Sequence, residues 1–574
     1  MQIKRFIYII LVVAVLGGIF LIYGIYENYA SSARVQNSAG SDRTYIGQVK
    51  IPEERMFRVG IIGTASDASS SRVYATVRQL CESLHFTIVE PEIASLGAQP
   101  TQSFAGPSAD LDVLIICDSH IGRYNSGHAL EAFVAQGGHV IFAAGISDED
   151  ADRDLYPMLG IQSVGETRNY HTLVFEDALL PVQPSQAHYA ESSDSRRIAV
   201  TDEVSVYLQS QEDAVPLLHV NDWQEGRACL INGGFLEDIR YAGLLTGCIG
   251  AMLSDFIYPV LGVKAVFIDD FPMHTASYDE LCKRAYGYSA NGFVEEVIWP
   301  AFQGISLRTN TPYTTSVRVM ASSAEDMRGV DEELLSNIDK WVLKFNGELA
   351  WGSDCLEAGD VVLDQTLIAQ FTELFPQYTI KSLTLGTDAY APQMLDIPKA
   401  EIKTVRGVLG DEKLQFVHDG EICVFPAATR GNVMEDGNLL AICSVIGAYG
   451  MVSHVFDADT LITEDGVSPA WDADKSQIGL FESDVLSKAP WLEGRTLSQT
   501  SDDVKSYLNL DCGWERQGNQ ISLDCGAAVV GQAFFYRCEK RIASAQGLTY
   551  QDAGNGYYLL RMQDSHGVIT LEEG

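Results

Sequence analysis

The residues best suited to chemistry are the paired carboxylates Asp269 and Asp270, which follow an apolar segment. From residue 263 the chain reads Val-Lys-Ala-Val-Phe-Ile-Asp-Asp-Phe-Pro. In α/β barrels and open α/β sheets, ligands bind where parallel strands reach their carboxyl ends. Two carboxylates at such an edge could supply a base that activates water and a ligand that holds a metal. We therefore predict a functional site at this strand end.

The spacing of the histidines argues against an ordinary zinc site at this position. No histidine occurs between His274 and His418. Zinc normally requires imidazole or thiolate ligands beside a carboxylate, and none of the 11 cysteines forms a Cys-x-x-Cys pair. His274 follows Asp270 by four residues, so these two are the candidate metal ligands. The cofactor expected is either none or one divalent metal such as zinc.

Composition limits the class of protein and its partners. The chain has 574 residues, too many for one domain, and 46% of them are hydrophobic. Its 39 basic and 77 acidic side chains give a net charge of −38. Nucleic acid and anionic lipid need a positive surface, which excludes them as main partners. A polymer with free amines fits this charge, and an acidic, well-solvated surface outside the cell is the simpler interpretation.

The N-terminus predicts a membrane anchor. Residues 6–26 carry no charge, and a helix needs about 20 apolar residues to cross a bilayer. Lys4 and Arg5 precede this run and place the N-terminus in the cytoplasm. We expect residues 1–27 to be an uncleaved anchor, although the small residues at 30–33 leave cleavage open. Residues 28–56 are expected to be a stalk, with the globular part outside a single-pass cell-membrane protein.

The remaining pattern predicts three folded units. Apolar strands alternating with helices at 57–255 indicate a doubly wound parallel α/β sheet. Strand and helix patterns with polar strand ends at 256–510 are typical of a (β/α) barrel. Short alternating strands at 511–574 indicate a small β-sandwich. Cys512, Cys525 and Cys538 in this last unit could form one disulfide in an oxidising compartment.

Three segments together resemble the polysaccharide deacetylase (NodB-homology) superfamily. They are Asp-Asp-Phe-Pro at 269–272, Tyr-Ala-Pro at 390–392 and Gly-Met-Val-Ser-His at 450–454. With an amidotransferase-like or flavodoxin-like domain before the barrel, the layout is similar to deacetylase-related proteins of bacterial exopolysaccharide clusters, including the Pel type. An uncharacterised family of the same layout is the nearest match, and the resemblance spans residues 57 to 510. It implies a polysaccharide substrate, amino sugars included, and exopolysaccharide export machinery as a partner.

The resemblance also implies roles for individual residues. Asp269 corresponds to the base, Asp270 to a metal ligand and His454 to the general acid that protonates the leaving amine. The family has a His-x-x-x-His metal motif after the second strand, whereas residues 347–356 contain no histidine. This departure predicts a degenerate site that binds polysaccharide without hydrolysing it.

Two aromatic residues are candidates for sugar binding. Tyr390 and Trp351 could stack on sugar rings or could fill the barrel mouth.

Two other functions are compatible with the sequence. An active hydrolase would be a deacetylase with a rebuilt metal site or a glycoside hydrolase with two carboxylates about 5–10 Å apart. Asp269 could pair there with Asp354 or with Asp388, which we also consider a substrate-binding residue. A surface sensor or structural module without a sugar ligand is the third class.

Overall fold

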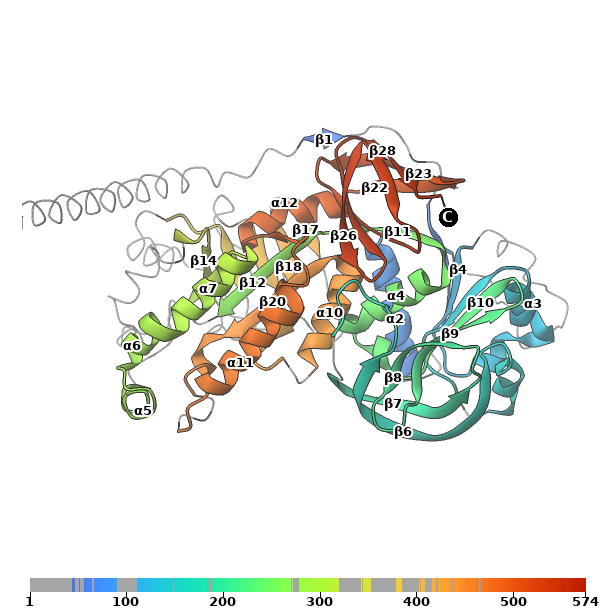
Figure 1. Cartoon of the computed structure of the whole chain (residues 1–574), viewed down its shortest axis with the longest axis horizontal. Helices are drawn as coiled ribbons and strands as arrows, with labels where there is room; N and C mark the ends of the chain where they lie inside the picture. The colour runs from blue at the N-terminus through green and yellow to red at the C-terminus, as the bar shows by residue number, and fades with distance from the viewer. Residues whose placement is uncertain are drawn as a thin grey trace, which may run out of the picture.

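The computed structural model describes most of the globular part of the chain (Figure 1). The described residues are 44–46, 51, 56–63, 67–89, 111–147, 149–184, 188–269, 271, 278–318, 342, 344–352, 378–384, 402, 404–407, 416–419, 422–434, 437–463, 465 and 467–573. The expected anchor at 6–26 and the residues Asp270, His274, Asp354, Asp388 and Tyr390 lie outside these ranges. Within them, no helix combines the length and apolarity needed to cross a membrane.

The first unit contains the predicted parallel sheet with an antiparallel extension. The strand order is β3-β2-β4-β5-β10-β9-β8-β6-β7. The first five strands are parallel and are apolar, as buried strands between helices must be. They are β2 (Arg58–Ile62), β3 (Thr87–Val89), β4 (Val113–Ile116), β5 (His139–Phe142) and β10 (Gly226–Ile231). The helices are α2 (Ala68–Ser83), α3 (Ala129–Ala135) and α4 (Ala242–Met252).

The antiparallel extension was not predicted. It consists of β6 (Ile161–Phe175), β7 (His188–Val200), β8 (Ser205–Ser210) and β9 (Pro216–Trp223). The first two form a long hairpin at the edge of the sheet. Most described residues of β6 are exposed, so the strand lacks the apolar run that marks β2 or β4. Polar, two-sided strands give little signal in sequence.

The second unit is a curled parallel sheet that is barrel-like. Its order is β17-β18-β16-β15-β14-β13-β12-β20-β19, and β18 and β19 are separated along the chain by only Ala427 and Ala428. One segment therefore pairs with β16 at its start and with β20 at its end, which brings the two edges together. The strands are β12 (Val263–Asp269), β13 (Tyr313–Arg318), β14 (Glu348–Gly352), β15 (Ser382–Thr384), β16 (Thr404–Gly407), β17 (Val417–Asp419), β18 (Ile422–Pro426), β19 (Thr429–Arg430), β20 (Met451–Asp457) and the short β21 (Glu493–Gly494), which pairs with β12.

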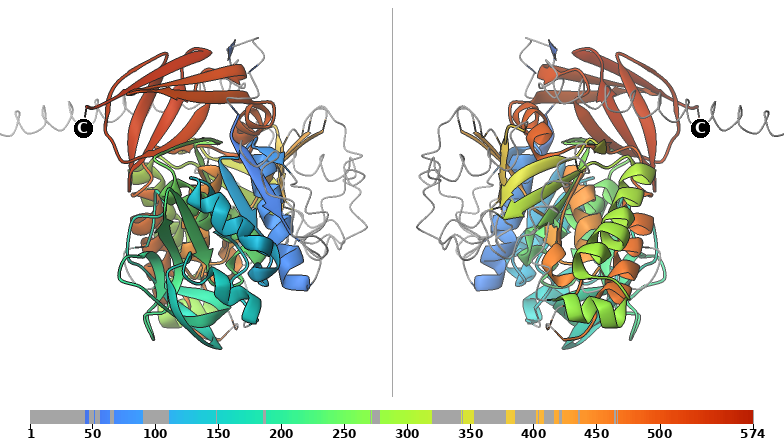
Figure 2. Two further views of the ribbon diagram at one scale, coloured as in Figure 1. Left: turned by 90° about the vertical axis from the view of Figure 1, so that its right-hand side faces the viewer. Right: turned by 90° about the vertical axis from the view of Figure 1, so that its left-hand side faces the viewer.

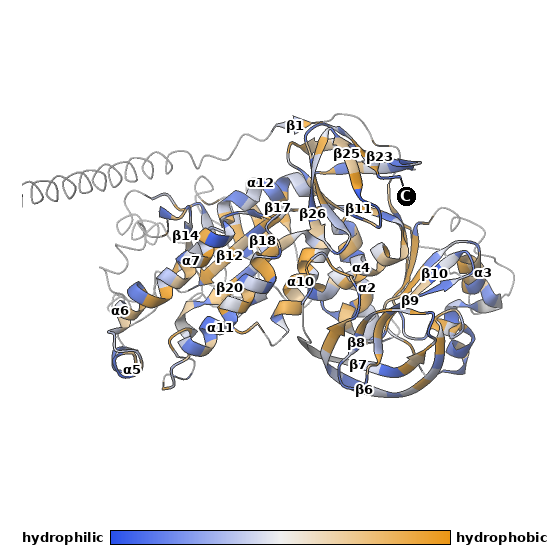
Figure 3. Ribbon diagram, in the orientation of Figure 1, coloured by the Kyte–Doolittle hydropathy of each residue, from blue (hydrophilic) through white to orange (hydrophobic). Residues whose placement is uncertain are grey.

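Helices cover the outside of this sheet. They are α5 (Asp279–Ala285), α6 (Ala290–Phe293), α7 (Trp299–Thr309), α10 (Asn438–Tyr449), α11 (Trp471–Phe481) and α12 (Leu497–Leu508). Figure 3 shows hydrophobic residues along α10 and hydrophilic residues along the outer sides of α11 and α12. The helices differ in hydropathy because α10 is buried on all sides, whereas α11 and α12 each keep a solvent-facing side.

The third unit is a β-sandwich that recruits strands from elsewhere in the chain. Its own strands are β22 (Asp511–Gln517), β23 (Gln520–Val529), β24 (Ala533–Cys538), β25 (Ile542–Gln546), β26 (Leu548–Gly554), β27 (Tyr557–Met562) and β28 (His566–Leu571). Strand β11 (Asp255–Val260) pairs with β24, and β1 (Tyr45–Ile46) pairs with β23. The sandwich thus extends beyond 511–574, and part of the expected stalk adds to its sheet.

The three units share interfaces. Figures 1 and 2 show the sandwich above the junction between the α/β unit and the barrel. Helices α4 and α10 approach so closely that a Cβ on Gly243 would lie 1.9 Å from the carbonyl oxygen of Ser444. The sandwich contributes Arg537 and Tyr557, which donate to the carbonyl oxygens of Gly247 and Leu179 at 2.7 and 2.9 Å. One continuous core runs through the α/β unit and the barrel.

Candidate functional site

Asp269 is the last residue of β12, and its carboxylate is buried in an ion pair with Arg406 of β16. Arg406 donates from Nη1 to Oδ1 at 2.6 Å and from Nη2 to Oδ2 at 2.7 Å. The two side chains are 0% and 1% exposed. Burial raises the pKa of Asp269, but the charge and the two N–H donors of Arg406 outweigh burial and hold this pKa below its ordinary value. The carboxylate is therefore ionised at neutral pH.

Three more side chains complete a group that we call the barrel-mouth cluster: Asp269, Arg406, Ser316, Arg430 and Asp457. Ser316 of β13 donates to Asp269 Oδ1 at 2.9 Å. Arg430 of β19 lies 3.4 Å from Asp269 Oδ2 and 2.5 Å from Asp457 Oδ1. These two outer residues remain accessible, with 37% of the Arg430 side chain and 22% of the Asp457 side chain exposed. The cluster thus offers solvent a guanidinium and a carboxylate, which suit hydroxyl and amine groups of a ligand.

His454 does not join this cluster. Strand β20 continues for three residues beyond His454, and its last residue, Asp457, is the register partner of Asp269. Successive residues of a strand point to opposite faces, so His454 lies on the face opposite to Asp457 and Asp269. Its ring packs against Phe481 of α11, with centroids 5.1 Å apart. The expectation that His454 stands beside Asp269 is therefore corrected.

The surroundings of His454 are those of a core residue. The side chain is 0% exposed, and its Nδ1 shares a hydrogen bond of 2.8 Å with Oγ1 of Thr429. Burial lowers the pKa of His454 to about 3, against the smaller opposing effect of a backbone hydrogen bond with Gly431. The ring is consequently neutral at neutral pH and lacks the second ring proton that an imidazolium would deliver to a leaving amine.

Trp351 is also placed away from the barrel mouth. It pairs in register with Val317 and Leu383, which puts it on the face of the sheet opposite to Ser316. The side chain is 1% exposed and part of the main core. Its ring offers no open face to a sugar, so the expected stacking role is corrected as well. The other expected substrate residues, Tyr390 and Asp388, lie outside the described residues.

Asp269, which directly precedes the proposed metal ligand Asp270, is poorly suited to hold a metal itself. Both oxygens of this carboxylate accept hydrogen bonds from Arg406, and Arg430 adds a second positive charge. Two neighbouring guanidinium groups disfavour a cation on the same carboxylate. The proposed ligands Asp270 and His274 lie outside the described residues, so their metal-binding role stays a prediction.

One other group among the described residues has the spacing of metal ligands. Donor atoms of Asp67, Asp118 and His120 all lie within 4.8 Å of one another. Each carboxylate already has a structural partner, however. Asp67 caps α2 by accepting from the Ser70 N–H at 2.7 Å. Asp118 accepts from Tyr124 Oη at 2.8 Å. A loop-ordering role accounts for this group.

The sequence interpretation missed both arginines of the barrel-mouth cluster. Each one directly precedes a glycine at a strand end, in Thr-Val-Arg-Gly at 404–407 and Thr-Arg-Gly at 429–431. That repeated ending could have marked Arg406 and Arg430 as residues of the same sheet edge.

The comparisons with known proteins give weak similarities. The family model "Uncharacterised protein conserved in bacteria (DUF2194)" matches residues 101–324. No curated protein matches the sequence. Among solved structures, the carbohydrate deacetylase Agd3 is similar over 90% of this chain and 99% of its own, with 10% identity and a TM-score of 0.49.

Two further structures match part of the chain. A putative ThuA-like protein from Bacteroides uniformis has 13% identity over 31% of this chain and 82% of its own, with a TM-score of 0.23. A cytoplasmic protein from Salmonella typhimurium has 13% identity over 34% of this chain and 99% of its own, with a TM-score of 0.27. At these scores the matches assign no activity to this protein.

Proposed function

We propose that this protein binds polysaccharide at the barrel mouth through a deacetylase-like site that is degenerate. The observation that supports it most directly is the position of Asp269, whose two carboxylate oxygens both accept from Arg406. A base that must take a proton from water needs a free lone pair directed at that water. The histidine expected as its acid partner faces the opposite side of the sheet. The described residues therefore form a set of hydrogen-bonding charges without a base and acid pair.

Arg430 and Asp457 are the groups that would contact a ligand in this proposal. Both are partly exposed, and each is held by a charged neighbour. A guanidinium donates to sugar hydroxyls, and a carboxylate accepts from hydroxyls or from a protonated amine. The chain's net charge of −38 also favours a polymer with free amines. An amino-sugar polymer is accordingly the ligand class proposed.

The cellular setting belongs to the same proposal and rests on sequence. The uncharged run at 6–26 after Lys4 and Arg5 would anchor the chain in the cell membrane with residues 28–574 outside. There it would meet secreted polysaccharide and export machinery. Added protease should digest the globular part of the protein on intact cells, and its complete protection would contradict this orientation.

The test of the site separates binding from hydrolysis. The detergent-solubilised full chain is dialysed, analysed for metal, and incubated with a partly N-acetylated hexosamine polymer. We expect retention of the polymer in affinity electrophoresis, no stoichiometric zinc and no acetate release. Arg430→Ala should weaken retention by about 1–3 kcal/mol, the value of a charge-assisted hydrogen bond. One tightly bound metal per chain, with acetate release abolished by Asp269→Asn, would refute the degenerate site.

A carboxylate-only glycoside hydrolase is the second candidate. Asp269 and Asp457 end two neighbouring strands in register, and Arg430 contacts both carboxylates. Paired carboxylates about 5–10 Å apart are the machinery of such enzymes. Release of reducing ends from the polymer, lost in Asp457→Asn, would favour this candidate over binding alone.

A further inference from the structure

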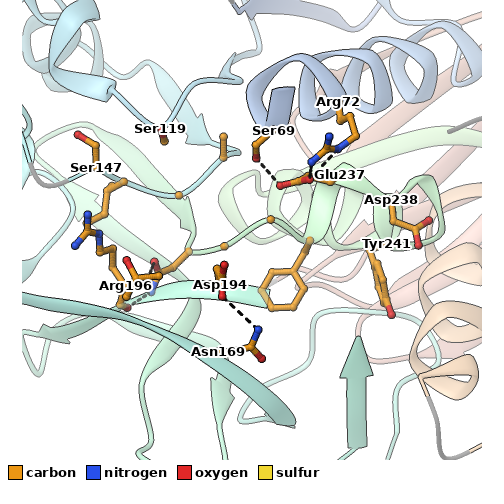
Figure 4. Close-up of a pocket in the computed structure, with 18 of the residues that line it drawn as sticks. Ser69, Arg72, Ser119, Ser147, Asn169, Asp194, Arg196, Glu237, Asp238 and Tyr241 are labelled. Carbon is orange, nitrogen blue, oxygen red and sulfur yellow. Dashed lines mark hydrogen bonds and ion pairs between the residues drawn. The ribbon is translucent and has the colours of Figure 1, made fainter. Parts of the chain in front are cut away.

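A polar cavity of about 760 Å³ lies in the α/β unit, and none of the barrel-mouth cluster lines it (Figure 4). One wall is formed where parallel strands end. Ser119 follows β4, Ser147 follows β5 and Asn232 follows β10. The crevice outside the carboxyl ends of parallel strands is where open α/β sheets bind their ligands. The cavity thus occupies the position in this fold that favours a binding site.

The opposite wall comes from the hairpin of β6 and β7, which has one face directed at the cavity. Asn169 of β6 and Asp194 of β7 are register partners, and the Asn169 amide donates to the Asp194 carboxylate at 3.2 Å. Thr167 and Asn169 of β6 line the cavity, and Arg168 lies between them in the strand. It does not line the cavity and instead forms ion pairs with Glu166 at 2.6 Å and Asp213 at 3.0 Å. The hairpin therefore separates a cavity face from an outer face.

Internal hydrogen bonds fix both walls. Asn232 is 1% exposed, and its side chain bonds to the backbone N–H and carbonyl of Arg196 at 3.2 and 2.7 Å. This ties the hairpin to the end of β10. On the α2 side, Glu237 accepts from Arg72 Nε at 2.8 Å and also from the Ser69 hydroxyl. A lining held in this way loses little conformational entropy when a ligand binds.

The charge balance of the lining excludes some ligands. The lining contains two arginines, Arg72 and Arg196. It also contains three carboxylates, those of Asp194, Glu237 and Asp238. Phosphate-bearing ligands need an excess of positive charge or a glycine-rich helix start, and the lining carboxylates would repel them. An apolar ligand would displace the water around these charges and around the hydroxyl and amide groups without offering hydrogen bonds in return.

A ligand that carries many hydroxyl groups satisfies this lining. Hydroxyls both donate and accept, so they can pair with carboxylates, amides and guanidinium groups alike. The rings of Phe235 and Tyr241 also line the cavity, edge to face with centroids 6.5 Å apart. Aromatic rings contact the C–H faces of sugars by apolar packing. The volume is within the range of roughly 300–1,000 Å³ found for small-molecule sites.

We propose that this cavity binds a short saccharide, with the Asn169–Asp194 pair and the Arg72–Glu237 pair bonding its hydroxyl groups from two walls. Figure 4 shows these two pairs projecting from different elements around the cavity. The site is separate from the barrel mouth, so it extends the proposed function and does not depend on it. The protein would then hold a polysaccharide or its fragments at two places.

The test is calorimetric titration of the detergent-solubilised full chain. The probes are the disaccharides of glucosamine and of N-acetylglucosamine, with cellobiose as a neutral sugar and inorganic phosphate as an anion. We expect at least one disaccharide to bind and phosphate not to bind. Asp194→Ala and Asn169→Ala should each raise the Kd of that sugar at least tenfold. Arg168→Ala, on the outer face of the same hairpin, should leave it within twofold.

Each remaining outcome overturns the inference. Absence of binding for all three disaccharides at millimolar concentration would contradict a saccharide site. Binding that survives both hairpin variants but is lost in Arg430→Ala would place the sugar in the barrel alone. Displacement of the sugar by phosphate would refute the ligand class. Asn169→Ala removes an exposed side chain, so it keeps the test decisive if Asp194→Ala fails to fold.

Discussion

Replacing Arg406 by methionine should destabilise the protein strongly, because it leaves a buried charge without its partner. Asp269 is 0% exposed, and Arg406 supplies two of its hydrogen bonds, at 2.6 and 2.7 Å. Breaking a buried ion pair by removing one partner costs about 3–5 kcal/mol. Ser316 and Arg430 still contact the carboxylate and should keep the loss at the lower end of that range.

The same variant should also change how the stability of the protein depends on pH, in a direction that the pKa of Asp269 determines. In the wild type the pKa of Asp269 lies below its ordinary value. Its contribution to stability is present above the unfolded pKa of 3.8 and is lost as the pH falls through the folded value. Without Arg406, burial dominates and the folded pKa rises above 3.8. The Arg406→Met variant should therefore gain stability relative to wild type as the pH falls from 7 toward 4.

Urea unfolding followed by tryptophan fluorescence measures both effects. The matched control is Arg308→Met, which breaks a bidentate but exposed ion pair with Glu482. This variant should lower the free energy of unfolding by less than about 1 kcal/mol. Adding Asp269→Asn to Arg406→Met should recover part of the loss, since it removes the unpaired charge. Equal destabilisation by Arg406→Met and Arg308→Met would refute the assignment of a buried ion pair.

Three further predictions address packing, acid stability and cysteine pairing. Gly243→Ala should cost at least about 1–3 kcal/mol in the free energy of unfolding because its Cβ meets the backbone of α10, whereas Gly479→Ala, with no atom near its Cβ, should be neutral or stabilising. His454 is protonated more easily in the unfolded chain (pKa 6.5) than in the folded one (pKa about 3). Stability should therefore fall as the pH drops between these values, by up to about 5 kcal/mol, and His454→Gln should flatten that slope. Cys512 and Cys525 are opposite each other on β22 and β23, so oxidation should link these two in peptide mass maps; a link from either one to another cysteine would contradict the register.

The strands that build the fold were largely predictable because they are buried on both faces. The apolar strands and helices expected to alternate at 57–255 include β2, β4 and β5, with α2 following β2. Continuous apolar runs mark such strands in any context. The hairpin of β6 and β7 and the recruitment of β11 into the sandwich were not predictable in this way. Their pairing depends on partners far along the chain, which periodicity does not reveal.

The candidate site was predictable only in part, for a related reason. Asp269 follows an apolar strand directly, so its place at the strand end could be inferred from local sequence. Arg406 lies 137 residues further on, and only the curvature of the sheet brings its strand across the barrel to Asp269. No local sequence pattern indicates a contact between residues so far apart along the chain. The contacts of Arg406 and Arg430 with Asp269 could therefore not be inferred before the fold was known.

The position of His454 shows that the residue at which a strand ends decides which side chains reach the barrel mouth. The resemblance implied that His454 acts at the barrel mouth, which a side chain at the end of its strand could reach. The strand instead continues to Asp457, and the alternation of faces then fixes His454 toward α11 and Asp457 toward Asp269. A residue can thus match a family motif in sequence while its side chain points to the opposite face of the sheet. The resemblance implied a base and an acid, Asp269 and His454, at the barrel mouth. Among the described residues the ion pair of Arg430 and Asp457 lies beside Asp269 instead, and this arrangement is why we propose binding rather than hydrolysis.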